Sequence, residues 1–182
     1  MNRIVLLGLL HAASASQVQT NYITPHEQYS SSVGLAPSRR VAYWPNPVDC
    51  NNICVKVSYG GRVLHLLHID TSETNYDISY DAWNYLVFGN SAVGDPRTGG
   101  GLLMETEYVS PTECHHLLDS DQLPLSAANS MAYLAPCLGQ SDSWVANHHQ
   151  LFNIYDPSCK YGWDEICTLD LAVSNQACCP MF

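Results

Sequence analysis

Two aspartates that could carry out acid chemistry, Asp70 and Asp77, occur in the stretch HIDTSETNYDISYDAWNYL, on either side of a short polar loop. Glycosidases cleave a sugar bond with two carboxyl groups, one of which is protonated and acts as the general acid. Aspartates at a strand end or before a helix also accept backbone N–H groups and shape their own loop. We expect this structural role for both residues and keep Asp77 and Asp70 as the catalytic candidates.

Aromatic side chains are the second set with possible chemistry, because flat rings stack on sugar rings. Trp163 and Tyr161 stand in the polar-flanked segment KYGWDE, which favours exposure and binding. Trp44 is a further binding candidate, although its place in a short apolar strand also suits core packing. We therefore assign glycan or protein binding to Trp163, Tyr161 and Trp44, together with Asp70 and Asp77.

Histidines occur in pairs along the chain. His65 and His68 are three residues apart in an expected strand, so their side chains should point to opposite faces. His115 and His116 are adjacent, as are residues 148–149, and both pairs are expected to be exposed. Histidine titrates near neutral pH, so the surface charge should respond to an acidic exterior. No cofactor is expected.

The first 17 residues have the build of a secretory signal peptide. Arg3 precedes an apolar run over residues 4–10, and small residues follow around position 14. The run is much shorter than the ~20 residues that span a bilayer. We therefore expect a secreted, extracellular protein.

Cysteine is abundant for a chain of 182 residues. In an exported protein such a number indicates a disulfide framework, and at least three disulfides are expected, with the pairing open. The spacing of the first two cysteines also occurs in zinc sites, but no matching second pair follows, so no metal is expected. The eight residues are Cys50, Cys54, Cys114, Cys137, Cys159, Cys167, Cys178 and Cys179.

Charge limits the partners. Acidic residues outnumber basic ones by 17 to 7, so nucleic acid and anionic membranes should be repelled. A cell-wall polysaccharide or a host protein remains as partner, and a monomer is expected.

The elements that must position these residues begin with a short strand over residues 41–44 and a hairpin. Two apolar runs flank Gly60 and Gly61, which can both take the positive φ of a two-residue turn. In that register Val55, Val57, Leu64 and Leu66 share one face of the hairpin, and we expect this face to pack in the core. A helix should follow over residues 80–88, capped by Ser79 and ended by Gly89.

The remaining segments complete a single domain. The glycine-rich residues 90–101 lack a Walker lysine and are expected to be a flexible surface loop, followed by a strand. Ser126 should cap a helix that Pro136 kinks or ends, and a short helix should run through SDSWVANHH. Residues 18–39 are expected to be a flexible leader, so the ordered domain should comprise residues 40–182.

The segment from Cys54 to Leu86 resembles the core motif of RlpA-like double-psi β-barrels, the superfamily of barwin, expansins, kiwellins and cerato-platanins. HID looks like the first aspartate-bearing strand end, and YDISYDAWNYL looks like the second. Most of the mature chain also resembles small secreted fungal proteins that act as effectors or elicitors of plant defence. The resemblance implies a mainly β fold, a six-stranded double-psi β-barrel with added helices, stabilised by disulfides.

The resemblance also implies a function, with departures. Asp77 matches the general acid of the related endoglucanases, but Pro45 stands where their base follows the first YW, and the next acid is Asp49. The relatives carry a cysteine ahead of VAYW that is absent here, so Cys178 or Cys179 is expected to be a free thiol. We therefore expect a non-catalytic binding protein of the plant apoplast. The alternatives are a glycan-cleaving enzyme, endoglucanase-like or lytic transglycosylase-like, and an inhibitor of a host enzyme.

Overall fold

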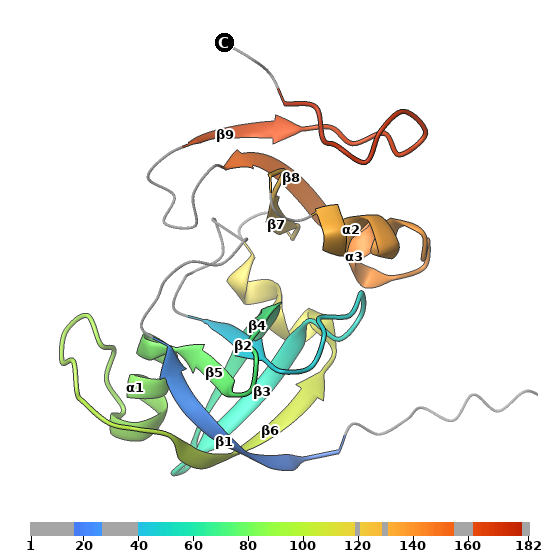
Figure 1. Cartoon of the computed structure of the whole chain (residues 1–182). Coiled ribbons are helices and arrows are strands. Elements are labelled where there is room, and N and C mark those ends of the chain that lie inside the picture. The colour runs from blue at the N-terminus through green and yellow to red at the C-terminus, as the bar shows by residue number, and fades with distance from the viewer. Residues whose placement is uncertain (1–16, 27–39, 119–120, 129–130, 155–161, 180–182) are drawn as a thin grey trace, which may run out of the picture.

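The computed structural model describes residues 17–26, 40–118, 121–128, 131–154 and 162–179. The expected signal peptide therefore lies almost wholly outside the described residues. A β-barrel forms one part of the molecule, and a smaller sheet with two helices forms the other (Figure 1). Within the described ranges, every helix is too short or too polar to cross a bilayer.

Six strands close the barrel in the order β1-β5-β2-β4-β3-β6. The pairs β1–β5 and β2–β4 are parallel, and the other neighbours are antiparallel. The mainly β fold and the closed six-stranded barrel are therefore confirmed. The strands are β1 (Gln19–His26), β2 (Val41–Trp44), β3 (Cys54–Tyr59), β4 (Arg62–Thr71), β5 (Tyr76–Ser79) and β6 (Leu102–Val109).

Strand β1 lies in the segment expected to be a flexible leader, and that expectation is wrong for Gln19–His26. The strand pairs with β5 on one side and β6 on the other, and Ile23 is fully buried. Its other side chains are mostly polar, so the segment shows no apolar alternation that would predict a strand. Backbone pairing with strands distant in sequence decides its structure. Residues 27–39 lie outside the described residues.

The hairpin is confirmed in turn and register. Gly60 and Gly61 have φ values of 56° and 79°. Val55 pairs with Leu66 and Val57 with Leu64, as the alternation predicted. These side chains contribute to a cluster inside the barrel that also contains Trp83 of helix α1 (Tyr80–Phe88).

Helix α1 ends as expected, and it fixes the loop that follows. Gly89 adopts a left-handed conformation and donates its N–H to the Tyr85 carbonyl. Ser79 occupies the N-cap position without forming a side-chain cap bond. The expected surface loop forms over residues 90–101, which are mostly exposed and contain no helix or strand, and polar side chains of α1 tether it.

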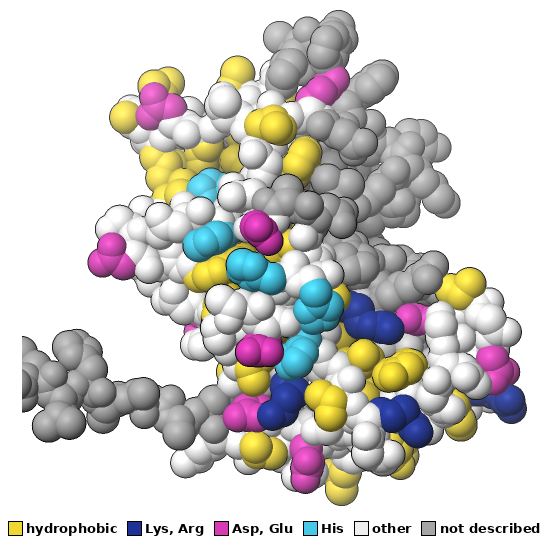
Figure 2. Space-filling model, turned by 180° about the vertical axis from the view of Figure 1, so that it is seen from behind, with side chains coloured by type: hydrophobic (Ala, Val, Ile, Leu, Met, Phe, Trp, Pro, Cys, Tyr) yellow, Lys and Arg dark blue, Asp and Glu magenta, His cyan; other side chains and the backbone are white. Residues whose placement is uncertain are grey.

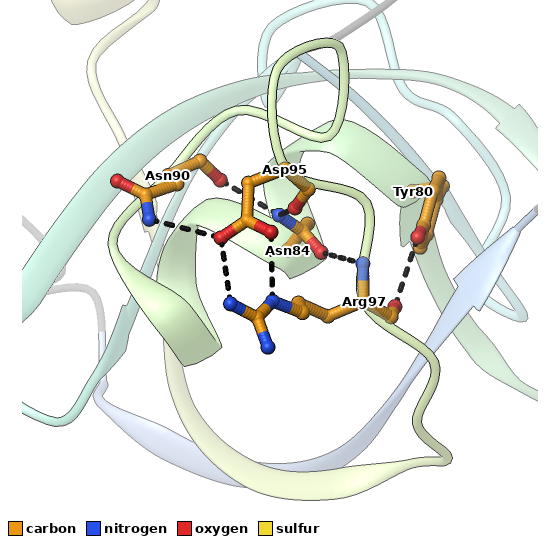
Figure 3. Close-up of polar contacts among 5 residues, drawn as sticks. All are labelled: Tyr80, Asn84, Asn90, Asp95 and Arg97. Atoms are coloured by element: carbon orange, nitrogen blue, oxygen red, sulfur yellow. Dashed lines mark hydrogen bonds and ion pairs between the residues drawn. The ribbon is translucent and has the colours of Figure 1, made fainter.

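Figure 3 shows how Asn84 of α1 holds this loop. Its amide nitrogen donates to the carbonyls of Asn90 and Asp95, and its oxygen accepts the N–H of Arg97 at 2.9 Å. The Tyr80 hydroxyl donates to the Arg97 carbonyl, and Arg97 forms an ion pair with Asp95. A polar residue on the buried side of a helix therefore satisfies the backbone of a loop that contains no regular element.

The second part of the molecule contains a three-stranded sheet in the order β7-β8-β9. The expected helix cap at Ser126 is wrong, since Ser126 ends β7 and pairs with Phe152. Pairing with a distant strand outweighs the local capping preference. The remaining elements are η1 (Pro111–Leu117), β7 (Leu123–Ser126), α2 (Met131–Leu138), α3 (Trp144–Asn147), β8 (His149–Ile154) and β9 (Gly162–Cys167).

Two apolar clusters hold the fold together. One fills the barrel, and the other lies between the barrel and the C-terminal part, where Leu67 of β4 packs in the same cluster as Leu134 of α2.

The expectation of at least three disulfides is confirmed. The disulfides are Cys50–Cys137, Cys54–Cys114 and Cys167–Cys179. Among the described cysteines, Cys178 is free and exposed, which agrees with the expected free thiol of the tail. Cys159 lies outside the described residues.

Candidate functional site

The two candidate aspartates lie on strands β4 and β5, at positions that pair with the same residue of the strand between them. Tyr43 of β2 pairs with Asp70 of β4 on one side and with Asp77 of β5 on the other. Neighbouring strands lie about 4.8 Å apart, so the backbones of the two aspartates are separated by about 10 Å. The fold therefore brings the sequence-predicted pair to one region with Tyr43 between them.

The Asp77 carboxylate is engaged by a neighbouring strand. It accepts a short hydrogen bond from the Thr24 hydroxyl of β1, at the position where Thr24 and Asp77 are register partners. Asp77 also pairs through its backbone with Tyr43, so β5 lies between β1 and β2, which both precede it by more than 30 residues. This arrangement fits the structural role that the sequence favoured. The side chain of Asp70 lies outside the described structure.

The binding role assigned to Trp44 is wrong. Trp44 is only 2% exposed and lies inside the barrel. Its ring is enclosed by Tyr76, Tyr108 and His68, with centroids 5.3 to 5.5 Å away. An indole enclosed in this way cannot stack on an external sugar.

The other two aromatic binding candidates lie in or next to β9. Trp163 belongs to β9, where its backbone pairs with Asn153, but its side chain lies outside the described structure. Tyr161 also lies outside the described residues.

A groove of about 1070 Å³ lies between the barrel and α3. Strands β3, β4 and β6 form one wall, and the segment around α3 forms the other. In the circular strand order β3 lies three positions from β5, so the groove and Asp77 are on opposite sides of the barrel. Its lining includes Asn51, Asn52, Lys56, His65, Glu107, Tyr108, Glu113, Asp142, Trp144, Asn147 and His148.

Trp144 and His148 form an aromatic pair in this groove. Their rings are stacked, with centroids 4.7 Å apart and planes 8° from parallel. The backbone N–H of Trp144 donates to the side-chain oxygen of Asn51 at 2.9 Å, which anchors the start of α3 on the segment before β3. His148 Nδ1 donates to the Trp144 carbonyl at 2.9 Å, because a carbonyl oxygen only accepts. The pair is therefore held rigidly from both ends.

Charges line the barrel wall of the groove. Lys56 forms a short ion pair with Glu107 on the neighbouring strand. Burial lowers the pKa of His65 below its ordinary value, Glu113 opposes this shift, and His116 and Lys56 reinforce it. The wall therefore combines a neutralised ion pair with an imidazole that stays uncharged at neutral pH.

Tyr108 connects the groove to the barrel interior. Burial raises the pKa of its phenol to about 12, against a weaker opposing hydrogen bond with Asn46. Its hydroxyl lies 3.0 Å from His68 Nδ1, and His68 is fully buried. The prediction that His65 and His68 face opposite sides of the strand is confirmed, since His65 lines the groove.

Sequence reasoning missed Trp144 as a site residue. The signal was present, because the expected helix through SDSWVANHH places Trp144 and His148 four residues apart, on one helical face. The opposite wall carried no comparable signal, since it consists of ordinary strand residues that tertiary structure brings near. Among the described residues, no group of three or more His, Cys, Asp or Glu side chains is placed to hold a metal ion.

Comparison with known proteins adds no family assignment, because neither a scan of protein-family models nor a search of curated proteins gave a match to this chain.

Proposed function

We propose that this protein is a secreted, non-catalytic binding protein of the RlpA-like double-psi β-barrel type. In this proposal it acts as a fungal effector or elicitor in the plant apoplast and binds a cell-wall glycan. The closed barrel of parallel and antiparallel strands is compatible with that fold. Three disulfides suit an oxidising, extracellular setting.

The observation that carries the proposal is the groove beside the Trp144–His148 pair. An apolar ring face next to amides is the usual chemistry of a sugar site, because a sugar ring presents C–H groups on its faces and hydroxyls at its edge. The groove supplies the stacked pair and the side-chain amides of Asn51, Asn52 and Asn147.

The contacts and positions of the carboxylates favour binding over cleavage. Asp77 is bonded to Thr24, and it lies on the side of the barrel away from the groove. Within the groove Glu107 is ion-paired with Lys56, and Glu113 and Asp142 are exposed. Pro45, which follows the YW of β2, cannot transfer a proton in place of the missing base.

Retention on insoluble chitin, β-glucan and cellulose tests the proposal. Wild-type protein should be retained on at least one polymer, and Trp144→Ala should weaken retention about tenfold, the effect of one aromatic anchor. Tyr22→Ala is the matched control, since Tyr22 is an aromatic residue, 58% exposed, on β1 outside the groove. The melting temperature of each variant shows whether it is folded, and Trp144→Phe keeps a ring if the alanine variant is unstable.

Other results would redirect the assignment. Equal losses in Trp144→Ala and Tyr22→Ala would show that the groove is not the glycan site. Release of soluble sugars would support the enzyme alternative. Indifference to all three polymers would contradict glycan binding and favour a protein partner, including the alternative of a host-enzyme inhibitor.

A further inference from the structure

Five histidines from β4, η1 and the junction of α3 with β8 lie near one another, and we call them the histidine band: His65, His115, His116, His148 and His149. The rings of His65 and His116 are 6.1 Å apart, and His115 is adjacent in sequence to His116. His115 lies 3.4 Å from Asp121, and Leu123, two residues later, is the register partner of His149. Figure 2 shows histidine side chains crossing one face of the molecule diagonally from the barrel to the C-terminal part.

Hydrogen bonds to backbone carbonyls fix the tautomer of two histidines of the band. His148 Nδ1 and His149 Nδ1 lie 2.9 Å from the carbonyls of Trp144 and Val145. A carbonyl only accepts, so each Nδ1 carries hydrogen and Nε2 is the nitrogen that takes up a second proton. Protonation therefore preserves both bonds to the backbone.

Fixed charges around the band are few. Lys56 of β3 and Glu107 of β6 face His65 as an ion pair, and Glu113 of η1 also acts on His65. Asp121 faces His115, and Asp142 lines the groove together with His148. With neutral imidazoles, four carboxylates face one ammonium group. With five protonated imidazoles, cations outnumber carboxylates by six to four, so the sign of the local charge reverses.

We propose that the histidine band binds linear polysaccharides rich in carboxylate groups at acidic pH and releases them near neutral pH. Histidine changes charge between about pH 5 and pH 8, so the reversal falls in a range that an acidic exterior reaches. The whole chain has a formal charge of −10 with neutral histidines, which opposes polyanion binding at neutral pH. Binding therefore depends on the local sign of this face.

A polysaccharide is the polyanion that best fits the face. The band shares His65 and His148 with the groove, so a charged chain lying on the band continues beside Trp144 and Asn147. Those side chains contact uncharged sugar atoms, and the imidazoles pair with carboxylates spaced along the chain. Burial lowers the pKa of His65, so this member gains charge only at a lower pH than an unperturbed histidine.

The test compares polygalacturonate with its fully methyl-esterified form, which has the same sugar backbone without the charge. Binding to polygalacturonate should be at least tenfold tighter at about pH 5 than at about pH 7.5, and should weaken with salt. The esterified polymer should show no such change with pH. The double variant His115→Gln/His116→Gln should bind about fivefold more weakly at the lower pH.

His26→Gln is the matched control, since His26 packs against Tyr43 on the far side of the barrel, and its binding should stay within about twofold of wild type. Binding that is equal at both pH values, equally reduced by both sets of variants, or absent at the lower pH overturns the proposal. Equal retention on anionic lipid vesicles overturns the choice of polysaccharide. Neutral-glycan retention through Trp144 is measured separately, so either proposal can fail while the other stands.

Discussion

At the scale of single residues, the Asp77 carboxylate joins two strands that are distant in sequence. The carboxylate belongs to β5 and accepts from Thr24 of β1, and the Asp77 backbone pairs with Tyr43 of β2. A carboxylate that bonds a hydroxyl across strands stabilises their register, because the charge strengthens the hydrogen bond. The same carboxylate would have to be free to reach a sugar bond if it were a general acid.

Asp77→Asn and Thr24→Val should each lower the free energy of unfolding by about 1 to 2 kcal/mol. The double variant should cost less than the sum, because each change removes the same bond, and the coupling should be about 1 kcal/mol. Urea unfolding of the four proteins measures it. Wild-type release of sugars from wall glycans, lost in a fully stable Asp77→Asn protein, would contradict the structural role.

Asp81 is a second residue with a clear energetic role. Burial acts to raise the pKa of this carboxyl, but hydrogen bonds from Ser91, Arg40 and the Ala92 N–H outweigh burial and hold the pKa below its ordinary value. Arg40 Nη1 lies 2.8 Å from Asp81 Oδ2, and the Asp81 side chain is only 7% exposed. The ion pair ties the residue directly before β2 to α1.

Because its pKa is lowered in the folded state, ionised Asp81 stabilises the protein above about pH 4, and this contribution declines as the pH falls through the folded value. Asp81→Asn should cost about 2 kcal/mol at neutral pH, since it leaves Arg40 partly buried without its carboxylate. Urea unfolding at neutral pH and near pH 3 should show a smaller difference between wild type and variant at the acidic pH. A difference that does not change with pH would contradict this assignment.

At the scale of elements, the loop after α1 combines polar tethers with close packing. A Cβ atom on Gly99 would lie 2.1 Å from the Trp83 ring, and one on Gly101 would lie 2.2 Å from Tyr22. A Cβ on Gly100, between them, would meet nothing within 4 Å. The loop therefore packs on both α1 and β1 at alternate residues.

Gly99→Ala should lower the free energy of unfolding by about 1 to 3 kcal/mol, because Trp83 belongs to the barrel core and must move. Gly100→Ala is the neighbouring control and should change it by less than about 0.5 kcal/mol. Thermal or urea unfolding compares the two. Equal stability of both variants would show that the loop does not pack on the helix in this way.

At the scale of the whole molecule, the cluster between the barrel and the C-terminal part contains the disulfides Cys50–Cys137 and Cys54–Cys114. Cys50–Cys137 spans 87 residues and joins the segment before β3 to α2. The Cys50 carbonyl also accepts the Val145 N–H at 3.0 Å. These links hold the two walls of the groove in place.

Replacing Cys50 and Cys137 together by alanine should destabilise the protein by about 1.5 to 2 kcal/mol more than replacing Cys167 and Cys179, because a longer loop gains more entropy when released. The second bond spans only 12 residues. Urea unfolding of the two double variants measures this difference. Alkylation of the native wild-type protein should label Cys178, because this thiol is free and exposed. A smaller loss for the longer loop would show that strain or packing, rather than chain entropy, controls these bonds.

Local features were predictable from the sequence because their causes lie within a few residues. Gly60 and Gly61 permit the hairpin turn, the alternation of Val55 and Val57 sets its inner face, and Gly89 ends α1. The disulfide framework followed from the number of cysteines in a chain that was expected to be exported, but the pairing did not.

Only the tertiary structure decided the features that depend on distant segments. Gln19–His26 became a barrel strand because β5 and β6 offer open edges, and Leu123–Ser126 became a strand because β8 lies beside it. Trp44 became inaccessible when the barrel closed. The groove formed because α3 lies across from β3 and β6. Each of these outcomes depends on contacts between residues far apart in the chain, and no local propensity carries that information.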